Sequence, residues 1–196
     1  MTIDLLFPTP VYRVVDTENF LDRPRLLESC LEVVARREVQ DRLSNPFHRV
    51  ASSHLVADHL HLEPRFSELK RFVEKHAGKF CRSLGYPSGK LRIRQMWVNA
   101  GKPGDFVYPH AHPGRNVFMA GVFYVKCDKR DGISILSQQS REESEVTTPL
   151  STTGQYYEGQ EGRLLLFRAD TLHGTFPQQG DSRVIISFNL ALDDAD

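Results

Sequence analysis

Three histidines in the second half of the chain have the spacing of a metal site. His110 and His112 are separated by one residue, so an extended backbone places both imidazoles on the same face. They follow the turn Gly101–Gly104 and precede the apolar run Val117–Val125, a position that suits the rim of a barrel. A third histidine, His173, follows a second apolar run and a tight turn. Imidazole nitrogens bind iron, zinc, copper and nickel, so the three residues predict a metal centre.

Arg183 stands ten residues after His173, at the head of an apolar run that ends at Leu192. A guanidinium buried in such a strand requires an anionic partner, and a carboxylate can satisfy it through two hydrogen bonds. We expect the strand opened by His173 to run beside that of Arg183, which would place Arg183 deep in a barrel beneath the metal. The alternative is that Arg183 pairs with a carboxylate at the surface.

The remaining histidines need no catalytic explanation. His48, His54, His59 and His61 fall in a polar stretch, and we expect them to be solvated. His76 falls on an apolar helical stripe and is expected to be a hydrogen-bonded residue of the core or its boundary.

Two helices are predicted in the first half of the chain. Apolar residues recur at helical spacing from Leu26 to Val34, after Asp22 and a proline suited to a first helical turn. A longer stripe lies between Pro64 and Gly85. Between the helices, Leu43–Leu62 is predicted to be irregular or to contain a short strand.

Strands dominate the second half, which predicts a mainly β fold with N-terminal helices. The two prolines within Leu5–Val15 favour an edge strand there. Further strands are predicted at Leu91–Val98, Val117–Val125, Ile133–Leu136, Arg163–Phe167 and Arg183–Leu192. Many short strands backed by two helices indicate a double-stranded β-helix, a jelly-roll barrel of cupin-like type with its helices bracing one sheet. We expect one domain over 1–196, with helical support in 1–90 and the barrel core and metal site in 91–196.

The composition excludes several classes of partner. Lys and Arg number 25, as do Asp and Glu, so no net charge attracts nucleic acid or an acidic membrane. The three cysteines, Cys30, Cys81 and Cys127, form no CxxC pair and predict incidental thiols in a reducing compartment. No basic region followed by an apolar stretch opens the chain, and no run approaches the ~18 apolar residues of a membrane span, which predicts a cytoplasmic protein.

Taken in order, these motifs resemble the bacterial, prolyl-hydroxylase-like branch of the 2-oxoglutarate- and iron(II)-dependent oxygenases. The resemblance covers nearly the whole chain. Its motifs are Leu6-Phe-Pro-Thr-Pro-Val11, Trp97-Val-Asn99, His110-Ala-His-Pro113, Gly121-Val-Phe-Tyr-Val125 and Arg183-Val-Ile-Ile-Ser-Phe-Asn189.

The resemblance implies a dioxygenase that uses Fe(II), 2-oxoglutarate and O2 and hydroxylates a small-molecule or peptide substrate, with release of succinate and CO2. His110 and His173 would be metal ligands, and 2-oxoglutarate would chelate the iron. The far carboxylate of 2-oxoglutarate would meet Arg183, helped by the hydroxyls of Tyr124 and Ser187. Asn99 is a further candidate for the cofactor pocket, as is Trp97, which is equally compatible with plain core.

The sequence departs from the superfamily at His112, where Asp or Glu is usual. Either His112 is the third ligand, or one histidine of the pair does not bind and Asp105 supplies a carboxylate. A three-histidine site also suits a cupin-type dioxygenase that needs no 2-oxoglutarate. A jelly roll that binds a metal or ligand without turnover is a third possibility.

The substrate itself is not identified by any motif. Arg115, Asn116 and Tyr156 are candidate substrate contacts, and Gln138–Tyr157 is a candidate lid because long loops between strands often cover a site. A homodimer through the N-terminal edge strand is compatible with the sequence.

Overall fold

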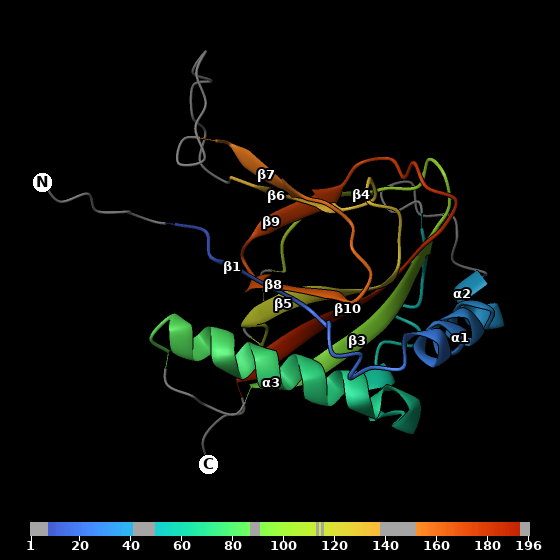
Figure 1. The fold of residues 1–196 in the computed structure, drawn as a ribbon, viewed down its shortest axis with the longest axis horizontal. Helices are drawn as coiled ribbons and strands as arrows, with labels where there is room; N and C mark the ends of the chain where they lie inside the picture. Colours follow the sequence, from blue (N-terminus) through green and yellow to red (C-terminus); the bar gives the residue numbers. More distant parts are fainter. Residues whose placement is uncertain are drawn as a thin grey trace, which may run out of the picture.

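The computed structural model describes residues 8–40, 50–86, 91–112, 114, 116–137 and 152–192. Two antiparallel sheets face each other, and the helices lie against the outer side of the larger one (Figure 1). The helices are α1 (Arg23–Val34), α2 (Arg37–Gln40) and α3 (Ser67–Ser83), with short 3-10 turns at Leu60–Leu62 and Pro64–Phe66. The strands are β1 (Val11–Val15), β2 (Ala51–Ser52), β3 (Leu91–Gly101), β4 (Val107–His110), β5 (Met119–Lys126), β6 (Ile133–Leu136), β7 (Gly154–Tyr157), β8 (Arg163–Arg168), β9 (Leu172–Thr175) and β10 (Arg183–Leu192).

The larger sheet has the strand order β1-β8-β5-β10-β3-β2, and the smaller has the order β4-β9-β6-β7. Strands distant in sequence are therefore neighbours, as a jelly roll requires. The predicted double-stranded β-helix is confirmed, and so is the bracing of one sheet by the helices.

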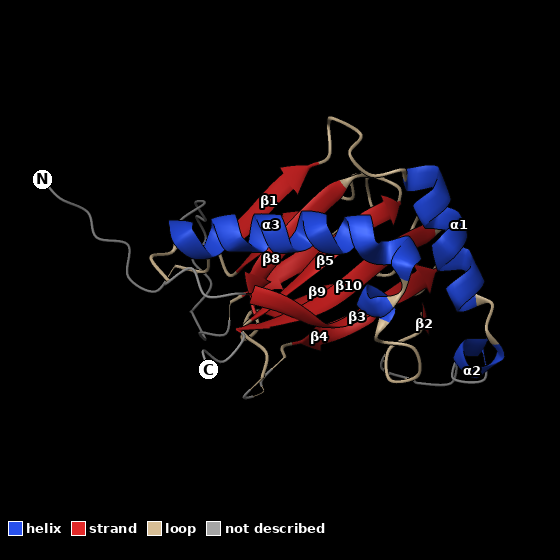
Figure 2. Cartoon of the chain, turned by 90° about the horizontal axis from the view of Figure 1, so that it is seen from below, coloured by secondary structure: helices blue, strands red, loops and turns tan. Residues whose placement is uncertain are grey.

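The helices form where the sequence predicts them. Asp22 caps α1, because its carboxylate accepts a hydrogen bond from the backbone N–H of Arg25, and proline occupies the first turn. The apolar stripe of α3 packs across the strands of the larger sheet (Figure 2). Its fully buried members, Leu69 and Val73, each contribute roughly 2 kcal/mol of hydrophobic stabilisation.

β5 is buried on both faces, which explains its nearly continuous apolar sequence. Phe123 and Val125 point towards the helices and join the larger core. Val122 and Tyr124, on alternate positions, point into the space between the sheets, where they meet Ile133 and Ile135 of the smaller sheet. The interior of the barrel is thus a second apolar layer.

β1 forms the predicted edge strand, and it is tied to the helical layer. It pairs with β8, and the hydroxyl of Tyr12 lies 2.8 Å from Nδ1 of His76 on α3. His76 is only 8 % exposed, so the expectation of a hydrogen-bonded core residue is confirmed. The part of the predicted strand before Pro8 lies outside the described residues.

One predicted strand arrangement is wrong. β9, which holds His173, belongs to the smaller sheet, whereas β10, which begins with Arg183, belongs to the larger. The two strands therefore face each other across the barrel instead of running side by side. The segment 176–182 carries the chain from one sheet to the other.

Two further expectations concern the cysteines and the membrane. Cys30, Cys81 and Cys127 are free thiols, the first two of them buried. Among the helices that the structure describes, none has the length and apolar character needed to span a bilayer.

Candidate metal centre

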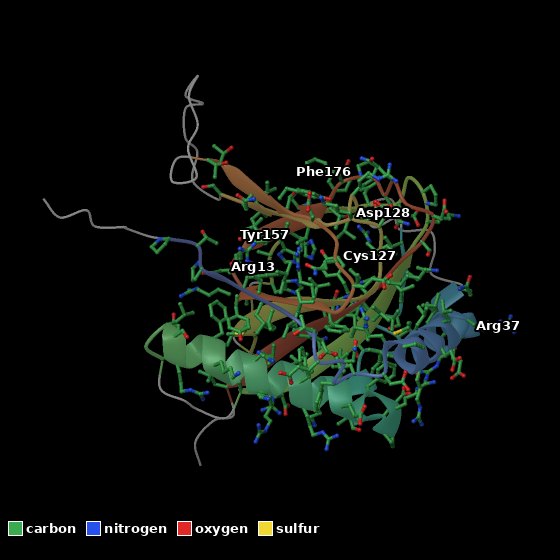
Figure 3. The ribbon with its side chains drawn as sticks, viewed as in Figure 1. Arg13, Arg37, Cys127, Asp128, Tyr157 and Phe176 are labelled. Carbon is green, nitrogen blue, oxygen red and sulfur yellow. The ribbon has the colours of Figure 1, made fainter. Side chains whose placement is uncertain are left out.

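A cavity of about 710 Å³ lies between the two sheets and is lined by residues of both. That volume is in the range of sites that bind small molecules. The larger sheet contributes residues such as Asn99, Tyr124 and Arg183, and the smaller contributes His110 and His173. Figure 3 shows the side chains of both sheets converging on this interior.

The three predicted histidines meet at the smaller sheet. Pairing of β4 with β9 sets His110 opposite His173. His112 lies two residues beyond β4, where its backbone N–H donates to the carbonyl of Ala169 at 2.8 Å. One ligand nitrogen from each ring lies within 4.8 Å of the other two, and Nε2 of His112 is 3.4 Å from Nε2 of His173. The cluster has the donor set and the spacing to hold one transition-metal ion.

Hydrogen bonds to backbone carbonyls orient two of these rings. Nδ1 of His173 lies 2.9 Å from the carbonyl oxygen of Thr171, and Nδ1 of His110 lies 2.9 Å from that of Tyr108. A carbonyl only accepts, so each Nδ1 carries the proton and each Nε2 carries the lone pair. This arrangement is typical of metal-binding histidines.

Burial keeps His112 and His173 neutral. It lowers the pKa of His112 to about 4 and that of His173 to about 3, and the neighbouring His110 adds to both shifts. Both rings are therefore unprotonated at neutral pH and able to donate a lone pair to a metal.

Arg183 lies in the same cavity, buried as predicted. Its side chain is only 2 % exposed, and burial lowers the pKa of its guanidinium. Nη1 has no hydrogen-bond partner, and none of the described carboxylates forms an ion pair with this side chain. A buried charged donor left without a partner destabilises a protein by about 1–3 kcal/mol or more. An anionic ligand fits this position.

The other predicted cofactor residues surround Arg183. Tyr124 and Ser187 line the cavity, as does Asn99, whose amide donates to the hydroxyl of Ser187 at 3.0 Å. Burial raises the pKa of Tyr124, so its hydroxyl keeps its proton and can donate. Trp97 also lines the cavity.

The prediction that His54 is solvated is wrong. Its ring lies 4.5 Å from that of Trp97, and it lines the cavity beside Leu55. Burial lowers its pKa. The pairing of β2 with β3 brings this segment to the cavity, and a strand of two residues leaves no periodic signal in a sequence.

Asp105 does not belong to the metal cluster. Its carboxylate accepts a hydrogen bond from the backbone N–H of Lys102 at 3.0 Å, so it closes the turn before β4. The cluster found among the described residues holds three histidines and no carboxylate. The proposal that Asp105 replaces His112 therefore finds no support in the geometry.

The two predicted substrate contacts that the structure describes, Asn116 and Tyr156, are not among the residues that line the cavity. Asn116 is exposed in a turn, and Tyr156 lines a separate hollow on the flank of the barrel, beside Arg13 and Tyr157 (Figure 3). The hydroxyl of Tyr156 accepts from the N–H of Gly132 and donates to the carbonyl of Arg130.

Two other predictions fall wholly or partly outside the described residues. Arg115 lies outside them, as do residues 138–151 of the predicted lid, Gln138–Tyr157. The end of that lid is β7, which pairs with β6.

Comparison with known proteins agrees with this geometry. A family described as "Putative 2OG-Fe(II) oxygenase" matches residues 95–189, which include all three histidines and Arg183. No curated protein matches the chain by sequence.

Solved structures show the same fold at low identity. A prolyl-4-hydroxylase from Pseudomonas putida is 12 % identical, with 94 % of each chain covered and a TM-score of 0.62. HygX from Streptomyces hygroscopicus, solved with nickel and 2-oxoglutarate, is 12 % identical, with 95 % of this chain and 84 % of that chain covered and a TM-score of 0.59. A viral collagen prolyl hydroxylase from Paramecium Bursaria Chlorella virus-1, in complex with 2-oxoglutarate, is 13 % identical, with coverages of 93 % and 96 % and a TM-score of 0.58. Through its strand-rich part, the chain is therefore similar to the 2OG-Fe(II) oxygenase family.

Proposed function

We propose that this protein is an iron(II)- and 2-oxoglutarate-dependent oxygenase that hydroxylates a small-molecule or peptide substrate. One observation carries the proposal: the unpartnered, buried guanidinium of Arg183 shares a cavity with a cluster of three histidines. A metal site alone would suit many proteins. A second, anion-binding position in the same cavity suits a co-substrate that carries a carboxylate at its far end.

Each member of the cluster has a role in this proposal. His110, His112 and His173 would each supply one imidazole nitrogen to the metal, and three protein ligands would leave positions for 2-oxoglutarate and O2. When bound, iron(II) and 2-oxoglutarate activate O2, so that one oxygen atom enters the substrate and the other enters succinate as CO2 leaves. The protein's part is to hold the reactants and to exclude water.

Arg183 would bind the far carboxylate of 2-oxoglutarate through two hydrogen bonds. Ser187 lies four residues further along β10, on the same face as Arg183, and its hydroxyl accepts a hydrogen bond from the amide of Asn99 at 3.0 Å. Tyr124 approaches from the neighbouring strand β5 and offers a protonated hydroxyl. These groups are fixed by the larger sheet, so the carboxylate meets a pre-formed site.

The absence of a carboxylate from the described cluster favours one alternative, a three-histidine dioxygenase that needs no 2-oxoglutarate. Such an enzyme has no use for a buried cation opposite its metal, unless its own substrate is an anion. The lack of a hydrogen-bond partner for Nη1 of Arg183 among the described residues therefore favours the 2-oxoglutarate-dependent reaction.

The first test is to titrate the anaerobic Fe(II) protein with 2-oxoglutarate and follow the visible metal-to-ligand charge-transfer band. We expect the band to form in the wild-type protein. Arg183→Ala should weaken 2-oxoglutarate binding roughly 100-fold, because a charge-assisted pair is worth about 2–5 kcal/mol. His173→Ala should abolish the band.

Arg71→Ala is the matched control, because Arg71 lies exposed on α3, outside the cavity. Its charge-transfer band and its affinity for 2-oxoglutarate should equal those of the wild-type protein. If iron binds but no band develops, the three-histidine site performs different chemistry and the proposal is wrong.

A further inference from the structure

One wall of the cavity includes His54 and Leu55 from a tight turn, Ser53–Ala57, that the proposed chemistry does not use. Ser53 is fully buried and fixes the turn to β3, because its hydroxyl accepts from the N–H of Val98 at 3.1 Å and donates to the carbonyl of Ala57 at 2.9 Å. The backbone of Ser53 adds a further hydrogen bond to Val98. The turn is thus held rigidly against the barrel.

Leu55, within this turn, combines an exposed side chain with an unusual backbone conformation. Its backbone has φ of 68°, in the left-handed region that bulky side chains rarely adopt. Its side chain is 67 % exposed and lines the cavity. An exposed leucine alone needs no explanation, but one held in a strained conformation at the wall of a binding cavity does, since such strain concentrates at functional sites.

The neighbours of Leu55 extend an apolar surface. The ring of His54 lies 4.5 Å from that of Trp97, and both line the cavity together with Val50 and Val107. The metal cluster is close to this surface, because the rings of Trp97 and His112 are 6.3 Å apart. A substrate group in contact with this surface would lie beside the metal.

The charge of the cavity restricts what that group can be. Within the described part of the chain, no Asp, Glu or Lys lines the cavity, and Arg183 is the one lining residue with a permanent charge. In the proposed function Arg183 is occupied by the co-substrate. The lining therefore offers an ammonium group no carboxylate and offers a second anion no free cation.

We infer that the substrate presents an uncharged, apolar group to the metal centre and that this group packs on Leu55 and Trp97. The inference rests on the oxygenase function proposed above and names its class of substrate: a molecule whose reacting carbon belongs to an aliphatic or aromatic group. The Ser53–Ala57 turn is its specificity element.

A charge series of small probes tests this. Benzyl alcohol, benzylamine and benzoate each carry one aromatic ring and are neutral, cationic and anionic at pH 7.5. Trp97 is the single tryptophan of the chain, so its fluorescence reports occupation of the cavity. The titrations use protein loaded anaerobically with Fe(II) and 2-oxoglutarate, and are repeated on the metal-free protein. We expect benzyl alcohol to bind at least tenfold more tightly than either charged probe.

Leu55→Asn separates recognition from folding. Asparagine tolerates the left-handed conformation, so the variant should keep the unfolding temperature of the wild type. It should nevertheless bind benzyl alcohol about tenfold more weakly, because the apolar contact is lost. Leu62→Asn is the matched control, since Leu62 is 69 % exposed and lies outside the cavity, and its affinity should not change.

The inference is overturned if benzylamine or benzoate binds as tightly as benzyl alcohol, if no probe changes the fluorescence, or if Leu55→Asn binds like the wild type. Failure of the two proposals can be told apart. A charge-transfer band without the expected probe preference would leave the oxygenase intact and remove its substrate class. The probe preference without the band would leave an apolar site in a protein of other chemistry.

Discussion

Arg183 is the residue at which stability and function most clearly oppose each other. Its guanidinium is buried, and Nη1 has no hydrogen-bond partner among the described residues. Desolvation of such a group is unfavourable, and burial is the largest influence on the pKa of Arg183.

We therefore predict that Arg183→Met stabilises the ligand-free protein. Methionine has a similar length and no buried charge, so the free energy of unfolding in urea should rise by about 1 kcal/mol. The same variant should lose the increase in unfolding temperature that 2-oxoglutarate gives to the Fe(II)-loaded wild type. A variant less stable than the wild type without 2-oxoglutarate would show that Arg183 has a structural role instead.

Single residues were predictable from sequence where their chemistry conflicts with their surroundings. An arginine in an apolar strand and a pair of histidines beside a buried strand stand out for that reason. Leu55 and His54 do not, because their importance depends on hydrogen bonds from Ser53 to a strand more than 40 residues away. Asp105 looked like a ligand by type, but a local turn uses its carboxylate.

At the scale of elements, the contact between β1 and α3 fixes an edge strand to the helical layer. The hydroxyl of Tyr12 and Nδ1 of His76 form the hydrogen bond, and the ring of Tyr12 also packs 5.5 Å from that of Phe80. An edge strand with few neighbours depends on such contacts.

Tyr12→Phe should keep the ring packing and remove only the hydrogen bond. We predict a loss of about 1 kcal/mol in the free energy of unfolding, because Nδ1 of His76 is left buried without a partner. The double variant Tyr12→Phe, His76→Phe should recover part of this loss, since both polar groups are then gone. An additive loss in the double variant, measured by urea unfolding, would argue against a direct interaction.

Elements of high and continuous apolar content could be predicted from the sequence, and β6, β8 and β10 were placed to within one residue. The strand expected at His173 is β9. β4 and β7 could not be predicted, because each is short, has few aliphatic residues and is stabilised by pairing with a strand distant in sequence. For the same reason the sequence did not show that β9 and β10 lie in opposite sheets.

At the scale of the whole molecule, the buried histidines make folding sensitive to acid. The pKa values of His112 and His173 are lowered to about 4 and about 3, whereas imidazoles in the unfolded chain titrate near 6.5. Below pH 6.5 the unfolded state therefore binds more protons than the native state, and the stability conferred by the neutral rings is lost progressively as the pH falls.

We predict that the metal-free protein loses roughly 2–4 kcal/mol of its free energy of unfolding between pH 7 and pH 4.5. His112→Gln, His173→Gln should lose less over the same range, because glutamine does not take up a proton. Urea unfolding at a series of pH values measures both, and equal slopes for the two proteins would contradict the assignment of the effect to these residues.

Fold class followed from the sequence at this scale because short apolar runs mark the strands along the second half of the chain. The class of substrate did not, since it depends on which charges are missing from a cavity that only the folded chain encloses.

The position of the site between two layers has a consequence for the lifetime of the protein. The proposed metal ligands belong to the four-stranded sheet and its flanking loop, whereas the groups for the co-substrate belong to the six-stranded sheet. A 2-oxoglutarate that chelates the metal and meets Arg183 would form a non-covalent cross-link between the layers. Without iron, partial opening of the layers would become easier and would expose the apolar interior to proteases and to aggregation. The iron supply of the cell would then determine how much of this protein survives, in addition to how fast it works.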